Sequence, residues 1–174
     1  MTLRVVVGID PGLSGAVATL LDGEPGPMLD MPTRRVDGVN EVAARQLATW
    51  LRELRAAHPG AFVLVCLEHV SAAPMAGRRQ GTSSMFNFGD GFGQVKAVLD
   101  VLGLPVVRVR PATWKAHFSL SGKGVDKDAG RQLAIARFPS AADQLRRKKD
   151  GGRADALLLA LWANTTDAQG RVAA

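Results

Sequence analysis

The chain has 174 residues, of which 47% are hydrophobic and 22% charged, and its 22 Lys and Arg outnumber its 16 Asp and Glu, giving a formal net charge of +6. This length is enough for one domain with its own core, and the composition excludes a largely disordered chain. The basic balance favours a polyanionic partner, with nucleic acid as the first candidate.

Cysteine usage and the apolar runs favour a cytoplasmic protein. The single Cys66 lies inside an apolar run, so we expect a buried thiol, and no intrachain disulfide can form. Met1 leads directly into the first expected strand, which leaves no room for a signal peptide. No apolar stretch reaches the roughly 20 residues that span a bilayer, so no membrane partner is expected. The compartment is then a bacterial cytosol, or a host cell if the gene is viral.

Hydrophobic periodicity predicts an α/β domain over residues 1–163, followed by a frayed tail over 164–174. In chain order we expect strands at 4–10, 16–21 and 28–31, a helix from an N-cap at Asn40 to about Ala57, a strand at 61–67, a helix from Phe88 to Leu102, a strand at 106–109, and helices at 111–118, 126–138 and 154–162. Residues 71–84, 121–125 and 146–152 are expected to be exposed connections. The order predicts a five-stranded mixed sheet, with an antiparallel hairpin first and parallel crossovers after it.

Three acidic residues stand out by their position along this pattern. Asp10 ends an apolar strand and precedes Pro11-Gly12, and Glu68 ends the second such strand. If the two strands are adjacent and parallel, both carboxylates lie at one edge of the sheet. Asp155 lies at the start of the apolar helix, where its sequence neighbours offer no cation. Three acids gathered together would raise each other's pKa unless a divalent ion neutralised them, and Mg²⁺ prefers such oxygen ligands.

Each acid also has a simpler interpretation. Asp10 could merely open a turn before Pro-Gly, Glu68 could pair with Arg110, and Asp155 could be an acid that suits a helix N-terminus. The joint pattern favours a metal site over these separate roles. Carboxylates at this density can hold two ions about 4 Å apart, an arrangement that cleaves phosphodiesters.

The motifs that carry these acids resemble those of a known family. They are Gly8-Ile9-Asp10-Pro11-Gly12 with Gly15, Leu67-Glu68-His69-Val70, Asn87-Phe88-Gly89 through Gln94-Val95, and Arg153 through Ala160. The set resembles the RuvC family of Holliday-junction resolvases, within the RNase H-like (retroviral integrase) superfamily, over residues 4–163. The resemblance implies an RNase H-like fold and a homodimeric endonuclease that resolves branched DNA to 5′-phosphate and 3′-hydroxyl ends. It also implies Mg²⁺, with Mn²⁺ as an alternative, at two ions per site.

The family uses four acids, and the resemblance implies Asp10, Glu68 and Asp155 as three of them. The fourth usually precedes the last by three residues, where this chain has Gly152. Asp150, next to a Gly-Gly hinge, is the candidate replacement. If it does not reach the site, one ion is bound weakly or only when DNA is present.

A basic run, Arg146-Arg147-Lys148-Lys149, precedes the last helix. The helix dipole does not favour positive charge there, so phosphate contact is the preferred interpretation and a solvated turn the alternative. The candidate DNA-binding residues are Arg78, Arg79, Lys115, Lys123, Lys127, Arg146, Arg147, Lys148 and Lys149. In the family resembled, a lysine near the third basic region assists at the scissile phosphate, which makes Lys123 and Lys127 the candidates for that role.

The family often has an aromatic residue shortly after the second acid, and here that stretch reads Ser71-Ala72-Ala73. Met75 or Phe86 could substitute, although core packing is the expected role of Phe86. Neighbouring side chains on a strand point to opposite faces, so His69 is not expected to share a metal with Glu68. His58 and His117 are likewise treated as bystanders.

Three rival functions fit parts of the pattern. A sugar-kinase or actin-like ATPase also opens with a strand carrying Gly-Ile-Asp, but it needs a second lobe for which 174 residues leave no room. A junction-binding protein with impaired catalysis fits the glycine at position 152. A nuclease acting on RNA/DNA hybrids would be a monomer without a large apolar patch on the Phe88–Leu102 helix.

Overall fold

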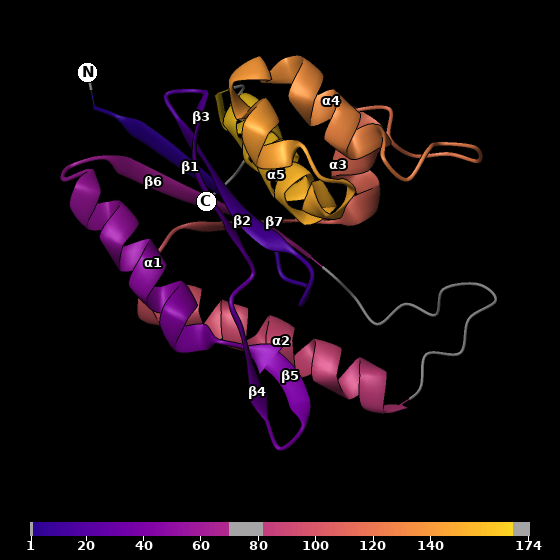
Figure 1. Cartoon of the computed structure of the whole chain (residues 1–174). Helices are drawn as coiled ribbons and strands as arrows, with labels where there is room; N and C mark the ends of the chain where they lie inside the picture. The colour runs from indigo at the N-terminus through magenta and orange to yellow at the C-terminus, as the bar shows by residue number, and fades with distance from the viewer. Residues whose placement is uncertain (1, 70–81, 169–174) are drawn as a thin grey trace.

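The computed structural model describes residues 2–69 and 82–168, and a five-stranded mixed sheet lies at its centre (Figure 1). The strands are β1 (Arg4–Asp10), β2 (Ala16–Leu21), β3 (Glu24–Asp30), β6 (Phe62–Glu68) and β7 (Val106–Val109), in the spatial order β3-β2-β1-β6-β7. β2 pairs antiparallel with β1 and β3, whereas β6 pairs parallel with β1 and β7. The predicted mixed sheet, with its hairpin first and its crossovers after, is confirmed.

Helices cover both faces of this sheet (Figure 1). One face packs against α1 (Ala44–Ala57) and α2 (Thr82–Val101). The other packs against α3 (Pro111–His117), α4 (Ala129–Arg137) and α5 (Gly151–Ala168), together with the 3-10 segment Pro139–Leu145. A second 3-10 turn, Lys148–Asp150, leads directly into α5. Within the described residues, no helix is both long and apolar enough to cross a membrane.

Alternation along β1 divides the interior into two cores. Val5, Val7 and Ile9 point to the α1 and α2 side, while Val6 points to the α5 side. Burial on both faces explains why this strand reads as a nearly continuous apolar run. By the same alternation, Asp10 lies on the α5 side of the sheet.

Gly8 sets how closely α5 approaches the sheet. A Cβ atom at this position would lie 1.9 Å from the carbonyl oxygen of Ala156 and 2.6 Å from the backbone nitrogen of Ala160. Any side chain would therefore push the helix away from β1. The contact brings the first turns of α5, including Asp155, over the end of the strand.

The predicted start of the first helix, at an Asn40 N-cap, is wrong. Residues 33–42 instead form a β-hairpin, β4 (Thr33–Val36) with β5 (Val39–Val42), and α1 begins only at Ala44. Asp37 and Gly38 have φ values of 49° and 80°, which is the conformation of a two-residue hairpin turn. An Asp-Gly pair between two valines is a hairpin signal that the helical periodicity further along had obscured.

Other element ends also differ from expectation. α4 begins at Ala129 rather than 126, and β3 begins at Glu24 rather than 28. α5 continues to Ala168, past the expected start of a frayed tail at 164. A tertiary contact explains the extension, because the Arg4 side chain donates to Asn164 at 3.0 Å and pairs with Asp167 at 2.6 Å. Residues 169–174 lie outside the described part of the chain.

Candidate active site

Asp10 and Glu68 end two neighbouring parallel strands at the same edge of the sheet. The register of β1 and β6 pairs Gly8 with Cys66 and Ile9 with Leu67, so the two acids follow at the next step. Cys66 belongs to the core on the α5 side, and alternation therefore places Glu68 on that side, as it does Asp10. The adjacent, parallel strands that their convergence requires are confirmed.

Asp155 approaches the same edge from α5, and the electrostatics of the three acids are coupled. Burial raises the pKa of Asp155 to about 6, the charge of Lys115 lowers it, and the charge of Asp10 raises it. Burial also raises the pKa of Glu68, with further increases from the charges of Asp10 and Asp155. Burial raises the pKa of Asp10. The Gly12 N–H, which donates to Asp10 Oδ1 at 3.3 Å, partly offsets this increase. The charge of Asp10 therefore acts on both Glu68 and Asp155, and the charge of Asp155 acts on Glu68.

Lys115 provides positive charge at this edge. Its Nζ lies 4.0 Å from Asp155 Oδ2, and its charge lowers the pKa of all three acids. The sequence neighbours of Asp155 offer no cation, so this one arrives through the tertiary fold, on α3. The sequence pattern places Lys115 only among the DNA-binding candidates.

Trp114, next to Lys115 on α3, is a site residue that the sequence reasoning missed. Its indole Nε1 donates to Glu68 Oε1 at 2.8 Å, and the side chain is fully buried. This bond lowers the pKa of Glu68 against the effect of burial. Glu68 is thus held by an indole rather than by Arg110, the partner considered from sequence. The hydrophobic pattern cannot distinguish such a tryptophan from one that only fills the core.

The donor chemistry of this edge fits Mg²⁺ or Mn²⁺. The edge offers three carboxylates, which are hard oxygen ligands, and the ammonium group of Lys115 acts on all three. Within residues 2–69 and 82–168, however, no three His, Cys, Asp or Glu side chains stand close enough together to hold an ion as they lie. The fold supplies donors at a common edge, and not a finished coordination shell.

Asp150 does not join the three acids. Its carboxylate is buried and accepts from the Arg147 backbone N–H and Nε, each at 2.8 Å, and Arg147 Nη2 lies 2.6 Å from its Oδ1. These contacts close the 3-10 turn before α5 and hold the pKa of Asp150 below its usual range. The expectation that residues 150–152 are exposed is wrong. Asp150 is buried in the 3-10 turn, and Gly151 and Gly152 are the half-buried first residues of α5.

Gly152, the position of the missing fourth acid, has no room for a side chain. A Cβ atom there would lie 2.5 Å from the Ser14 carbonyl oxygen and 3.0 Å from the Gly15 Cα. Residues three apart on a helix share a face, so Gly152 lies on the face of Asp155. The turn after β1 fills the space in which a fourth carboxylate would stand.

The basic candidates are spread over several elements. Arg146, Lys148 and Lys149 are exposed before α5, while the guanidinium of Arg147 is engaged with Asp150. Lys123 and Lys127 are exposed in the connection before α4. That connection ends near the acids, because a Cβ on Gly130 would lie 3.1 Å from Asp155 Oδ1. Arg78 and Arg79 lie outside the described residues.

The aromatic and histidine expectations have mixed outcomes. Phe86 is 74% exposed on α2, so the expectation that it packs in the core is wrong. Met75 lies outside the described residues. His69 packs edge-on against Phe92 of α2, at 6.1 Å between ring centroids, which places it on the face of the sheet opposite Glu68.

Comparisons with known proteins agree with this fold. No family model matches the chain. The chloroplastic Holliday junction resolvase MOC1 of Chlamydomonas reinhardtii is 40% identical over 91 residues, which cover 52% of this chain and 10% of that protein. The chain therefore matches about a tenth of the length of this curated relative.

Two solved structures cover nearly the whole chain. The T. thermophilus RuvC in complex with a Holliday junction substrate has a TM-score of 0.62 at 16% identity, covering 97% of both chains. A Thermus thermophilus RuvC structure has a TM-score of 0.58 at 18% identity, covering 97% of this chain and 98% of the other. The RuvC-like, RNase H-like fold implied by the sequence motifs is confirmed.

Asp155→Asn should stabilise the protein at pH 8 and not at pH 4. The folded-state pKa of about 6 exceeds the ordinary value of 3.8, so the folded protein binds this proton more tightly than the unfolded chain does. Ionisation therefore costs stability as the pH rises from about 4 through about 6, and asparagine removes that cost. We expect a melting temperature a few degrees above wild type at pH 8, since 1 kcal/mol corresponds to about 2–4 °C in a domain of this size.

Melting curves at five pH values from 4 to 8 measure this difference. Asp143→Asn, at an exposed position away from the acids, is the control and should follow wild type throughout. A gain from Asp155→Asn of the same size at every pH would contradict the electrostatic explanation.

Proposed function

We propose that this chain is a metal-dependent endonuclease that resolves four-way (Holliday) or other branched DNA junctions, leaving 5′-phosphate and 3′-hydroxyl ends. The observation that carries the proposal is that Asp10 and Glu68 end neighbouring parallel strands of a RuvC-like sheet, within electrostatic reach of Asp155. The relative that is 40% identical over half the chain is named a Holliday junction resolvase, and a structural neighbour is bound to a Holliday junction substrate. Both support branched DNA as the substrate class.

In this proposal Asp10, Glu68 and Asp155 hold Mg²⁺ or Mn²⁺, two ions per site. Such ions, when bound, activate a water and stabilise the leaving oxygen of a phosphodiester. The chain's own residues prepare the acids for this role. The Gly12 N–H orients Asp10, the Trp114 indole orients Glu68, and Lys115 faces Asp155. Lys115 also brings a positive charge to the edge at which a DNA phosphate would arrive.

One alternative function is favoured by a specific observation. Gly152 leaves no space for a fourth acid, and Asp150 is engaged by Arg147, so the site has three acids among the described residues. A protein that binds junctions but cuts them poorly would fit this smaller ligand set. A nuclease acting on RNA/DNA hybrids fits less well, because α2 presents exposed apolar side chains, including Phe86 and Phe88.

Cleavage of a synthetic four-way junction in Mg²⁺ or Mn²⁺ tests the proposal. Asp10→Asn should cut at less than about one-hundredth of the wild-type rate, because losing a metal ligand should cost more than the roughly 10- to 100-fold typical of outer-shell partners. Asp143→Asn is the control and should cut like wild type. Persistent cutting by Asp10→Asn would reject the metal site, and a wild type that binds without cutting would favour the junction-binding alternative.

The basic turn before α5 is proposed to contact DNA phosphates through Lys148 and Lys149, which are exposed. Replacing both with alanine should weaken binding to all junctions alike. It should also reduce the slope of log affinity against log salt by about 0.9 for each phosphate that is no longer neutralised. Fluorescence anisotropy at several salt concentrations measures this slope, with Lys96→Ala on α2 as the control. An unchanged slope would count against phosphate binding by this turn.

Arg147→Ala should behave differently from the two lysine substitutions. Because it leaves the buried Asp150 carboxylate without its guanidinium partner, it should lower the free energy of unfolding. Urea denaturation of the variant beside wild type measures this difference, and an unchanged midpoint would contradict a structural role for the pair.

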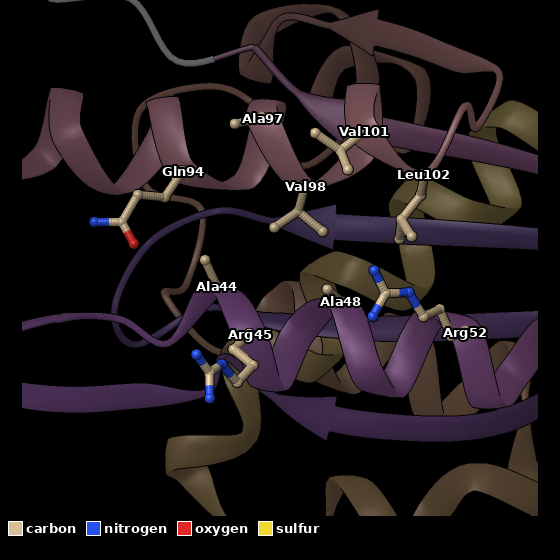
Figure 2. A pocket seen from close by; sticks show the side chains of 9 residues that line it. All are labelled: Ala44, Arg45, Ala48, Arg52, Gln94, Ala97, Val98, Val101 and Leu102. Carbon is tan, nitrogen blue, oxygen red and sulfur yellow. The ribbon is translucent and has the colours of Figure 1, made fainter.

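We also propose that the chain acts as a homodimer through the surface formed by α1 and α2. A groove of about 310 Å³ runs between these helices, lined by apolar side chains such as Ala48, Val98 and Leu102, with Arg45 and Arg52 beside it (Figure 2). Val101 at its border is 80% exposed. Exposed apolar patches of this kind mark interaction surfaces, and a two-fold partner would present two sites to symmetric strands of a junction.

Val101→Asp should shift the protein from dimer to monomer, because it would bury a charge in the proposed interface. Sedimentation velocity across a concentration series measures the shift. Val125→Asp, which is exposed in the connection before α4, is the matched control and should remain dimeric. A wild type that is monomeric at all concentrations would overturn this interface.

A further inference from the structure

The indole of Trp114 contacts two charged site residues of opposite sign. Its Nε1–H donates to Glu68 Oε1 at 2.8 Å, and its ring lies 5.2 Å from the Nζ of Lys115. Indole has a positive edge and a negative face, so each contact matches the charge that it meets. Lys115 in turn lies 4.0 Å from Asp155. One side chain therefore touches both the negative and the positive components of the site.

We propose that Trp114 is a positioning residue that holds Glu68 and Lys115 in the orientations that the metal site requires. The inference rests on the proposed metal-dependent function and names a residue that acts on the site through Glu68 and Lys115. Trp114 itself touches neither DNA nor metal in this proposal.

Burial and hydrogen-bond chemistry support more than a packing role. Trp114 is among the largest side chains that are completely buried, and indole Nε1 is a donor with no acceptor capacity. A buried donor needs a partner, and here the partner is a carboxylate, which makes the bond charge-assisted. A phenylalanine would fill much of the same apolar space without requiring that partner. The nitrogen is therefore the part of the side chain that core packing does not explain.

The bond restricts a side chain that is otherwise long and mobile. Glu68 stands at the end of β6 with three rotatable bonds, and the indole holds one of its two carboxylate oxygens. Its other oxygen is not part of that bond and is left to act as a ligand. Outer-shell partners of this kind orient metal ligands and contribute to metal affinity.

The indole is itself held firmly in place. α3 begins at Pro111, directly after β7, the strand whose Val109 pairs with Glu68. Phe118 packs against the Trp114 ring edge-on, at 6.5 Å between centroids. The position of the Nε1–H therefore follows from the sheet edge that also positions Glu68.

Trp114→Phe tests the inference, because it keeps an aromatic ring and removes the N–H. Calorimetric titration of the full-length chain with Mn²⁺ should show a dissociation constant raised about 10- to 100-fold. Junction binding measured without metal should stay at the wild-type level. Trp162→Phe, the same change in the same core, is the control and should leave Mn²⁺ binding unchanged. In a Glu68→Ala background, Trp114→Phe should have no further effect on Mn²⁺ affinity, since the two residues act as a unit.

The outcomes separate this inference from the proposed function. Unchanged Mn²⁺ affinity in a folded Trp114→Phe protein overturns the positioning role and leaves the nuclease proposal intact. A wild-type chain that binds no Mn²⁺ and cuts no junction overturns the nuclease proposal, and this inference with it.

A second measurement serves if Trp114→Phe does not fold. The chain has three tryptophans, so Trp50→Phe and Trp162→Phe assign the Trp114 indole signal by elimination in ¹⁵N-labelled wild type. MgCl₂ should shift that signal, and Glu68→Gln should abolish the shift. An indole signal that Mg²⁺ leaves in place would overturn the inference.

Discussion

The close crossing of α5 over β1 determines most of what this molecule can do. Gly8 lets the backbone of the helix lie against the strand, and Gly152 lets its first turn lie against Ser14 and Gly15. A helix this close carries Asp155 to the edge at which Asp10 ends β1. The same closeness leaves no space for a side chain at position 152. One packing constraint therefore both brings Asp155 toward the edge at which Asp10 lies and excludes a side chain from position 152.

This arrangement has an electrostatic cost. Burial raises the pKa values of Asp10, Glu68 and Asp155, and repulsion from neighbouring acids raises those of Glu68 and Asp155 further, so their ionised forms are unfavourable in the folded protein. Lys115 and the Trp114 indole offset part of that cost, and both come from α3. Functional sites commonly retain such destabilising charge because their chemistry requires it. In the proposed function, a bound divalent cation would offset the remainder of this cost.

The sheet separates this chemistry from the surface proposed for assembly. Alternate side chains along β1 pack into two different cores, one beneath α5 and one beneath α1 and α2. The acids belong to the first side by the alternation along β1 and β6. The apolar groove lies between α1 and α2 on the second side (Figure 2). A partner could therefore cover the groove without filling the acidic edge.

The sequence predicted the structure best where an apolar run corresponds to a strand that is buried in the fold. The apolar runs before Asp10 and Glu68 predicted buried strands, and their order predicted the parallel pairing that brings these acids together. The hairpin at 33–42 was also readable from Asp37-Gly38, and was missed because the helical periodicity that follows it was extended too far. Phe86 was assigned to the core from its residue type, although it is exposed on α2.

By itself, the sequence determined the strands β1, β2, β6 and β7, because apolar runs bounded by turn residues are visible in the chain itself. The RuvC-like fold was implied by the resemblance of its motifs. Only the tertiary structure decided which side chains meet the three acids. The fold brings Trp114 and Lys115 to them from α3. Asp150 pairs with Arg147 and does not join the three acids. The contacts of Trp114 with Glu68 and of Lys115 with Asp155 join segments far apart in sequence, and the steric limit at Gly152 depends on a backbone that packs against it. Arg147 and Asp150 are only three residues apart, and the 3-10 turn before α5 brings them together.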